Sequence, residues 1–465
     1  MCLFSFQKNN FAAFLCIGFL GVFPLHGADL DAKKIVDDSS LRISIKDTWL
    51  TEVPAKALAR RPEVRSLPGG GRVELRSEAE PGRDEFTTVL AREFNGSGIG
   101  AGRGSFPGWA QGSWVLIRRK DTGEATRIRV FLRSDKYTYV QFRPMTGDKC
   151  MMDVILYGAY LQRSLPLAIP FSRLYTMPLQ EILALAGPDF PQQYFEPNPG
   201  DYRELQLFMK NLRQRLPEVH FTDDGAIDEK GRYVFIETLE QQSPLSLDGT
   251  NTGGLNCSGF AKWVVDGILK PVTGELLPIT PLKQRFGDRG SSFTEPWEES
   301  RDPFFGLDWC RNLAERAWTT LRSPAYGKLE EFEVRNQRFS QVIVRGKNSV
   351  TLRAYPGFLP NAGFGTEGIE PLLYTLAVDE PGRIYLAAVN TEMGPPTTAD
   401  NLRGRPRMRQ YFHIAVLVPW FDGLGNFRVT VFESAEETSF DAFKTRYPGH
   451  YINLVRIQPG TAFEP

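Results

Sequence analysis

The chain contains 465 residues, enough for about two or three domains of roughly 100–200 residues each. Its 42% apolar and 24% charged residues are ordinary for a globular protein that can bury a full core. Lysine plus arginine and aspartate plus glutamate each number 55, so the formal net charge is zero. We therefore expect no general attraction to nucleic acid or to an anionic membrane.

Residues 1–28 have the pattern of a secretory signal peptide. Lys8 precedes an apolar run from Phe11 to Leu25, and His26-Gly27-Ala28 offers small residues for cleavage. The run is shorter than the roughly 20 residues that a helix needs to span a bilayer. We expect an exported protein, periplasmic or extracellular, with no transmembrane span in the mature chain. An uncleaved N-terminal anchor is the alternative.

A polar linker is expected at residues 29–40, followed by a β-rich domain at residues 41–175. Three short runs in this domain are rich in β-branched and aromatic residues, and turn residues separate them. The runs are Trp114–Arg118, Arg127–Leu132 and Tyr137–Phe142. Short strands at regular spacing predict an antiparallel meander in a sandwich or a barrel.

A helical connector is predicted at residues 176–230, because Pro178–Ala186 and Tyr202–Leu216 show helical spacing of apolar residues. Residues 231–465 mix both kinds of element, so the fold class is α+β. The expected strands are Tyr233–Glu237, Phe332–Val344, Tyr374–Leu376, Arg383–Val389, Phe412–Pro419, Phe427–Glu433 and Tyr451–Ile457, and the expected helices are Leu307–Leu321 and Phe440–Arg446.

The segment Gly253–Leu269 carries the residue with the clearest chemical potential. After two glycines and Cys257, the apolar residues follow the helical period. Cys257 is therefore expected in the first helical turn, where unpaired N–H groups and the helix dipole favour an anion. A thiol in this place has a lowered pKa, which makes it a better nucleophile at neutral pH. We predict that Cys257 is a catalytic nucleophile.

The other two cysteines of the mature chain have less reactive surroundings. Cys310 lies on the apolar face of a predicted helix, where a buried, inert thiol is expected. Cys150 lies beside a β-rich stretch, and both a core position and a disulfide are open to it. Neither a G-x-S-x-G motif nor the clustered ligands of a zinc site occur, so no cofactor is expected.

A base for the thiol must come from one of three histidines. His220 is expected at the surface, and His450 in a loop or in contact with a substrate. His413 opens a predicted strand, and a hairpin centred on Gly423 would place it directly opposite Glu433. The carboxylate would then fix the tautomer of the imidazole and stabilise its charged form. A surface His–Glu pair on an ordinary hairpin is the alternative.

The block Asn256-Cys257-Ser258-Gly259-Phe260 at the head of a helix resembles the Asp-Cys-Ser-Gly-Phe/Leu signature of the NlpC-type cell-wall cysteine peptidases, a papain-like superfamily. The strand that begins at His413 is similar to the histidine strand of that family. The resemblance implies Cys257 as nucleophile, His413 as base and Glu433 as the orienting group. It also implies a helix packed on an antiparallel sheet, and hydrolysis of amide bonds in peptidoglycan stem peptides.

The resemblance covers two short blocks and has three departures. Asn256 replaces the usual aspartate, no tyrosine occurs in residues 246–254, and the long separation between Cys257 and His413 implies an insertion at about residues 271–410. Beyond the three implied catalytic residues, Asn251 and Ser258 are candidate oxyanion donors, and loop arginines could bind a substrate carboxylate. These arginines include Arg407 and Arg409.

Two other functions remain open from the sequence. The same Cys–His pair could serve an acyltransferase or transpeptidase, because hydrolysis and transfer both pass through a thioester. The chain could also be a catalytically inactive envelope-binding protein, attached through its β-rich half.

Overall fold

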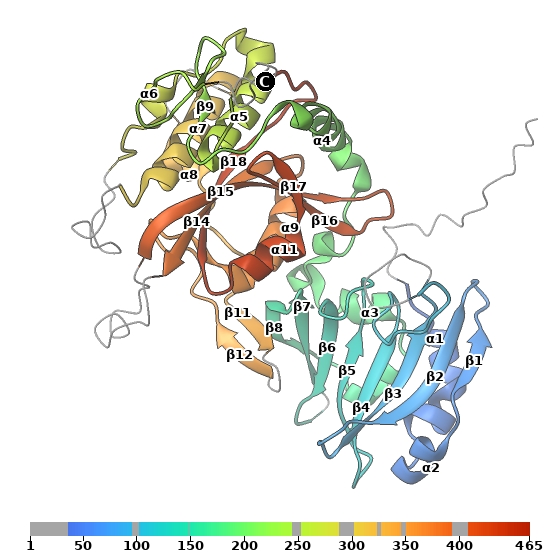
Figure 1. Ribbon diagram of the computed structural model, residues 1–465. Helices are drawn as coiled ribbons and strands as arrows, with labels where there is room; N and C mark the ends of the chain where they lie inside the picture. The colour runs from blue at the N-terminus through green and yellow to red at the C-terminus, as the bar shows by residue number, and fades with distance from the viewer. Residues whose placement is uncertain are drawn as a thin grey trace, which may run out of the picture.

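The computed structural model describes residues 36–94, 102–147, 149–243, 253–287, 302–322, 327–345, 350–392 and 408–465. The predicted signal peptide lies outside these residues. The fold is α+β, and two large antiparallel sheets each pack against helices (Figure 1). None of the described helices combines the length and the apolar character that a membrane span requires.

The first sheet contains ten strands and begins with an eight-stranded antiparallel meander. The meander strands are β1 Glu63–Ser66, β2 Arg72–Ala79, β3 Glu85–Arg92, β4 Trp114–Arg119, β5 Ala125–Val130, β6 Tyr139–Pro144, β7 Cys150–Leu156 and β8 Ala159–Leu167. The three runs predicted from the sequence correspond to β4, β5 and β6, so the meander is confirmed. The predicted sandwich or barrel is wrong, because the described strands form one open sheet and helices, not a second sheet, cover its core face.

The helices on this core face come from both ends of the N-terminal region. They are α1 Ser39–Ile45, the π-helix η1 Lys46–Leu50, α2 Pro54–Ala59, the 3₁₀ helix η2 Phe171–Tyr175 and α3 Leu179–Ala184. Alternate strand residues such as Phe142 and Val154 bury against them. The expected linker ends earlier than predicted, since the Asp38 carboxylate accepts the Leu41 N–H at 3.0 Å and caps α1.

Residues 187–234 lead from the first sheet to the core that contains α4, α5 and α7. The 3₁₀ helices η3 Gly187–Asp189, η4 Gln192–Tyr194, η5 Pro199–Tyr202 and η6 Leu216–Glu218 flank α4 Arg203–Arg215, and the short strands β9 Ala226–Ile227 and β10 Tyr233–Val234 pair with each other. The predicted apolar face of α4 is buried at Leu205, Phe208, Met209 and Leu212. These residues join the core around α5.

The second sheet has six antiparallel strands in the order β13-β18-β14-β15-β16-β17. Their bounds are β13 Phe364–Gly365, β14 Ile384–Glu392, β15 Met408–Phe421, β16 Phe427–Glu433, β17 Glu436–Ser439 and β18 Tyr451–Ile457. In Figure 1 the sheet curls around α9 Ile369–Asp379 and α11 Phe440–Arg446. The other face packs on α5 Cys257–Thr273 and α7 Phe305–Leu321.

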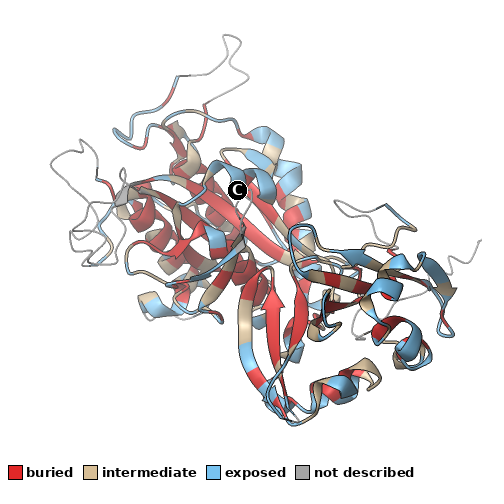
Figure 2. Ribbon diagram, turned by 90° about the horizontal axis from the view of Figure 1, so that it is seen from below, coloured by how far each residue is buried: buried red, intermediate tan, exposed pale blue. Residues whose placement is uncertain are grey.

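The alternation of β15 divides its side chains between two cores, as the sequence predicts. Ile414, Val416 and Val418 belong to the core with α5 and α7. Ala415 and Leu417 belong to the core with α9 and α11. Buried residues are accordingly concentrated in the strands and in the helix faces turned toward them (Figure 2). A sheet covered on both faces holds its strands firmly. His413 lies inside β15, beyond the part that pairs with β16, and Glu433 is the last residue of β16.

Three predicted strands are wrong in whole or in part. Of Tyr233–Glu237, only Tyr233 and Val234 form a strand, β10. Tyr374–Leu376 lies inside α9, because a short apolar run buried on all sides has no periodicity that separates strand from helix. In the predicted strand Phe332–Val344, the first residue ends α8 Leu329–Phe332, and only the last four belong to β11 Gln341–Arg345.

The segment expected as an insertion, residues 271–410, is not a separate unit in its described parts. It supplies α6 Ile279–Leu282, α7, α9 and β14, and β14 is a central strand of the second sheet. It also supplies the hairpin of β11 and β12 Val350–Ala354. This hairpin joins the first sheet, since Ile343 N–H donates to the Gly158 carbonyl at 2.8 Å. The same segment therefore ties the two sheets together.

Candidate active site

Cys257 is the first residue of α5, as predicted. Asn256 caps the helix, because its side-chain oxygen accepts the Gly259 N–H at 2.8 Å. The predicted apolar stripe of the helix, from Phe260 to Leu269, is buried against the second sheet. Capping and burial together fix the helix start, so the Cys257 side chain has a defined position at the edge of the core.

The turn before Cys257 is held by Gln242, a residue that the sequence does not single out. Its side-chain amide donates to the Gly254 carbonyl at 3.1 Å and accepts the Gly254 N–H at 2.9 Å. It also donates to the Val234 carbonyl at 3.2 Å. Gln242 is 6% exposed, so these bonds form in a region with little access to water. They fix the backbone that leads into α5.

His413 and Glu433 meet through a hydrogen bond of 2.7 Å between Nε2 and Oε2. The predicted register is wrong by two residues, because Phe421 rather than Pro419 faces Phe427, and the same offset puts Ala415 opposite Glu433. The Asp422 carboxylate accepts the N–H groups of Leu424 and Asn426 and closes a five-residue loop. A shift of two residues keeps both side chains on one face, so they meet as diagonal neighbours.

Three neighbouring groups favour the charged form of the Cys257 sulfur. These are the His413 ring, the Ile414 backbone N–H and the Ser258 hydroxyl. Burial alone would raise the pKa of Cys257, but the hydrogen bond and the positive charge of His413 lower it below its ordinary value. Because Nε2 of His413 is bound to Glu433, Nδ1 is the ring nitrogen left to exchange a proton with the sulfur.

The pKa of His413 moves in the opposite direction. Burial would lower this pKa, but the hydrogen bonds to Cys257 and Glu433 raise it to about 9. A lowered thiol pKa beside a raised imidazole pKa favours the thiolate–imidazolium pair at neutral pH. This charge state is the one that a cysteine nucleophile uses.

Glu433 is held from two sides. Its second oxygen accepts the Thr438 hydroxyl at 2.6 Å and also the Arg446 guanidinium. Burial would raise the pKa of Glu433, but the bonds from His413, Thr438 and Arg446 lower it to about 2. The carboxylate therefore stays charged over the whole physiological range and keeps its orientation toward His413.

The remaining predicted site residues are distributed differently. Ser258 is buried, and its hydroxyl lies close enough to the Cys257 sulfur to help lower the pKa of that thiol. Asn251 and Arg407 lie outside the described residues. Arg409 belongs to β15, but its side chain is outside the description.

The other histidines and cysteines lie outside the group that contains Cys257, His413 and Glu433. His220 is exposed, as predicted, and His450 packs its ring 5.7 Å from the Tyr447 ring. Cys150 and Cys310 are both free and buried, which rules out a disulfide for Cys150. Burial raises the pKa of Cys150 to about 11 and raises that of Cys310 well above its ordinary value.

A cleft of about 620 Å³ lies between two segments that are close in the chain to Cys257 and Glu433, although Cys257, His413 and Glu433 are not among its lining residues. The first wall is the stretch from Val219 to Phe221, and the His220 carbonyl accepts the N–H of Leu255, two residues before Cys257, at 2.7 Å. The other wall is the turn Ser434–Glu437, which directly follows Glu433. Such a volume suits a substrate segment.

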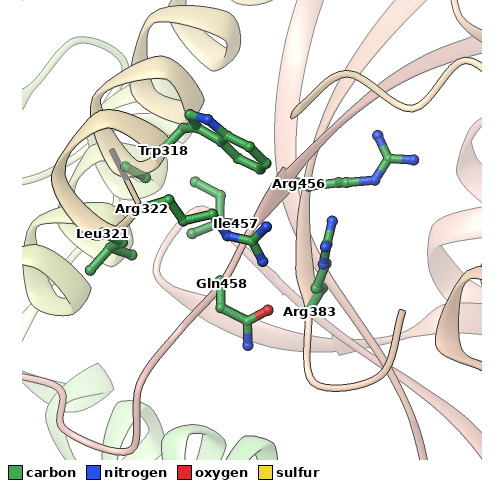
Figure 3. Close-up of a pocket in the computed structure, with 8 residues that line it drawn as sticks. Trp318, Leu321, Arg322, Arg383, Arg456, Ile457 and Gln458 are labelled. Carbon is green, nitrogen blue, oxygen red and sulfur yellow. The ribbon is translucent and has the colours of Figure 1, made fainter. Parts of the chain in front are cut away.

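A second hollow carries no comparable argument. It lies between the end of α7 and strands β14 and β18, and its volume of about 10 Å³ is close to that of one water molecule (Figure 3). Trp318, Arg322, Arg383 and Arg456 line it. Two of these arginines are already paired with Glu380.

Several functional candidates had no local signal in the sequence. Gln242, Thr438, Arg446 and the ring of Tyr447 reach the site from segments with ordinary composition. The turn Ser434-Ala435 offers one geometric sign, because both residues have positive φ, of 50° and 67°. Such values are costly for residues other than glycine, and they often occur near functional sites.

Gly259 provides a test of how closely the Cys257 turn is packed. A Cβ at this position would lie 1.9 Å from the Gly225 carbonyl oxygen, so the backbone would have to move. In Gly259→Ala, overpacking should destabilise the fold by up to about 3 kcal/mol. The better helix propensity of alanine should stabilise it by about 1 kcal/mol, so the overpacking outweighs the gain. We expect urea unfolding to show a free energy of unfolding lower by about 2 kcal/mol. Gly423→Ala, which has no atom within 4 Å, should leave it unchanged; an equal loss in both variants would contradict the packing argument.

Comparison with known proteins bears on the N-terminal region. A family model described as a domain of unknown function (DUF8515) matches residues 31–194. The match spans the meander and its covering helices. It ends beside Phe195, the last residue of the core between the first sheet and these helices. Searches of curated proteins and of solved structures gave no match.

Proposed function

We propose that this protein is an exported cysteine hydrolase that cleaves an amide bond through a thioester on Cys257. The observation that carries the proposal is the hydrogen bond of 2.7 Å from His413 to Glu433, next to a thiol whose pKa His413 lowers. A buried cysteine with structural functions only would resemble Cys310, whose pKa is raised, whereas the pKa of Cys257 is lowered.

In this mechanism the Cys257 thiolate attacks the amide carbonyl carbon, and the carbonyl π electrons move to the oxygen. The Cys257 backbone N–H, at the first helical position, has no intrahelical acceptor and can donate to that oxygen. When the intermediate collapses, the C–N bond breaks and His413 gives its proton to the leaving amine. His413 then takes a proton from water, which attacks the thioester and releases the thiolate. Glu433 stabilises the charged imidazole throughout.

We infer stem peptides of peptidoglycan as the substrate class. The similarity to the NlpC-type motif at Asn256–Phe260 supports this class, and the packing of α5 against the histidine strand agrees with the arrangement that the resemblance implies. In this proposal the first sheet would serve attachment to the envelope.

The pH dependence of alkylation tests the assignment of the nucleophile. We expect iodoacetamide to modify Cys257 at pH 6–7, below the ordinary thiol pKa of about 8.5, because the lowered pKa of Cys257 increases the thiolate fraction there. The rate should fall only when the pH falls through the lowered pKa of Cys257. Mass spectrometry should find Cys150 and Cys310 unmodified under these conditions. Modification of Cys257 only near pH 8.5 and above would contradict the proposal.

The pH profile of turnover should have an upper limb, which is a decline at high pH. The raised pKa of His413 means that the imidazole stays protonated below about pH 9 and loses its proton above it. Turnover should therefore decline above about pH 9, since the leaving amine loses its proton donor, while alkylation continues. An assay with stem-peptide fragments and an added amine separates hydrolysis from acyl transfer by its products.

A further inference from the structure

Tyr447 lies against His413, the proposed catalytic histidine. It directly follows α11, and its ring centroid is 5.8 Å from that of His413 at an angle of 33°. The same ring lies 5.2 Å from Phe443 and 5.7 Å from Phe412. These contacts on several sides hold the ring in one orientation.

The hydroxyl of Tyr447 has no hydrogen-bond acceptor among the described residues, although the side chain is half-buried. Some buried tyrosines use their hydroxyls inside the protein. Those of Tyr202, Tyr355 and Tyr374 donate to backbone carbonyls at 2.8, 2.9 and 2.5 Å. The Tyr447 hydroxyl is not among the buried side-chain atoms without a partner, so it is open to water and can donate to a substrate.

The charges around Tyr447 keep this donor protonated. Burial raises the pKa of Tyr447, and the negative charges of Glu433 and Cys257 add to the increase against the opposing charge of Arg446. The phenol is thus neutral at physiological pH and lies within the electrostatic field of the thiolate. When Cys257 attacks a carbonyl group, that negative charge moves from sulfur to the carbonyl oxygen.

The site needs a second donor for this oxygen besides the Cys257 N–H. The Ser258 hydroxyl already helps to lower the pKa of the Cys257 thiol, and Asn251 lies outside the described residues. We propose that Tyr447 is a further catalytic residue, whose hydroxyl donates a hydrogen bond to the substrate carbonyl oxygen as it becomes the oxyanion. This inference rests on the proposed function of Cys257 as an acyl-accepting nucleophile.

Two reagents that attack the same sulfur separate this function from simple support of His413. With p-nitrophenyl acetate the C–S bond forms at a carbonyl carbon, the electron pair passes through the oxygen, and p-nitrophenolate leaves. With iodoacetamide the C–S bond forms at a methylene carbon and iodide leaves, so no oxyanion arises. A donor to the oxyanion therefore accelerates only the first reaction.

The test is Tyr447→Phe in the full chain, which keeps the ring packing and removes the hydroxyl. We expect acylation by p-nitrophenyl acetate to slow by about 10²–10³-fold. We expect the rate of alkylation by iodoacetamide and its pH profile to stay unchanged. Equal slowing of both reactions would show that Tyr447 only positions His413 and would overturn the inference, as would unchanged acylation.

Tyr160→Phe is the matched control. Tyr160 is also partly buried, but it lies on β8 of the first sheet. Both rates should equal those of the original protein, and a similar loss of acylation in this control would overturn the inference. The proposed function is tested separately: if the unaltered protein reacts with neither reagent at Cys257, the nucleophile assignment fails, whereas loss of selectivity in Tyr447→Phe alone concerns only the tyrosine.

Discussion

Replacing Cys257 by alanine should abolish amide hydrolysis, with a loss on the order of 10⁵–10⁶-fold in kcat. The reason is that no other described nucleophile contacts His413 in the way the Cys257 sulfur does. Hydrolysis of stem-peptide fragments, followed by chromatography of the products, measures the loss. Alkylation by iodoacetamide at pH 6–7 should disappear in the same variant.

The fold of Cys257→Ala should survive, because Cys257 lies at the edge of the core and is only partly buried. Cys310→Ala provides the opposite control. Cys310 is fully buried in α7, so its loss should lower the free energy of unfolding by about 1–2 kcal/mol while turnover remains. Hydrolysis that persists in Cys257→Ala would rule out the thioester mechanism.

Replacing Glu433 by glutamine should lower turnover by about 10²–10⁴-fold, as carboxylate-to-amide changes beside a catalytic histidine do. The amide has nearly the same shape but no charge to stabilise the imidazolium. In the original protein, one Glu433 oxygen accepts from the His413 Nε2–H and the other accepts from Arg446. The amide has only one oxygen, and its nitrogen cannot accept a hydrogen bond. Initial rates as a function of pH measure the change.

The same variant should move the upper limb of the pH profile. The carboxylate contributes to raising the pKa of His413 to about 9, so its removal shifts this limb to lower pH. Stability should change as well. Because the pKa of Glu433 is lowered to about 2, its contribution is present above about pH 4.5 and is lost as the pH falls toward 2. Glu433→Gln should lack this acid-dependent loss.

Glu380→Gln is the control for the removal of a charged carboxylate. Glu380 binds Arg456 at 2.8 Å at the far end of β14, away from His413. Its loss should leave turnover and the position of the upper limb unchanged. An upper limb that stays near pH 9 in Glu433→Gln would show that the His–Glu contact does not control the charge of His413.

Local patterns were sufficient to locate much of the fold. The stripe from Phe260 to Leu269 predicts α5, and the predicted bounds of Phe440–Arg446 and Tyr451–Ile457 agree with α11 and β18. These elements have a clear period and sharp end signals, such as the Ser439 hydroxyl that caps α11. Where a segment is buried on all sides, as in α9, the period vanishes and the prediction of a strand was wrong.

Strand register shows how much tolerance a pattern allows. The hairpin turn signals around Gly423 predict a reversal, but the Asp422 carboxylate closes a shorter loop than predicted and the register moves by two residues. Because strand side chains repeat every two residues, this error leaves Glu433 on the His413 face. A shift of one residue would have separated them, so the pairing depends on the parity of the register more than on its exact value.

The sequence by itself determined the cysteine at a helix start, the histidine strand and the face on which a carboxylate can reach it, because each depends on spacing along a few neighbouring residues. Only the tertiary structure decided which groups complete the site. Thr438 and Arg446 hold Glu433, Gln242 holds the turn before Cys257, and Tyr447 packs on His413. Such contacts join segments far apart in the chain, and they depend on how α11 and the β9–β10 region dock on the second sheet. Hydrophobic periodicity specifies which face of an element is buried, but it does not specify which distant polar group that face will meet.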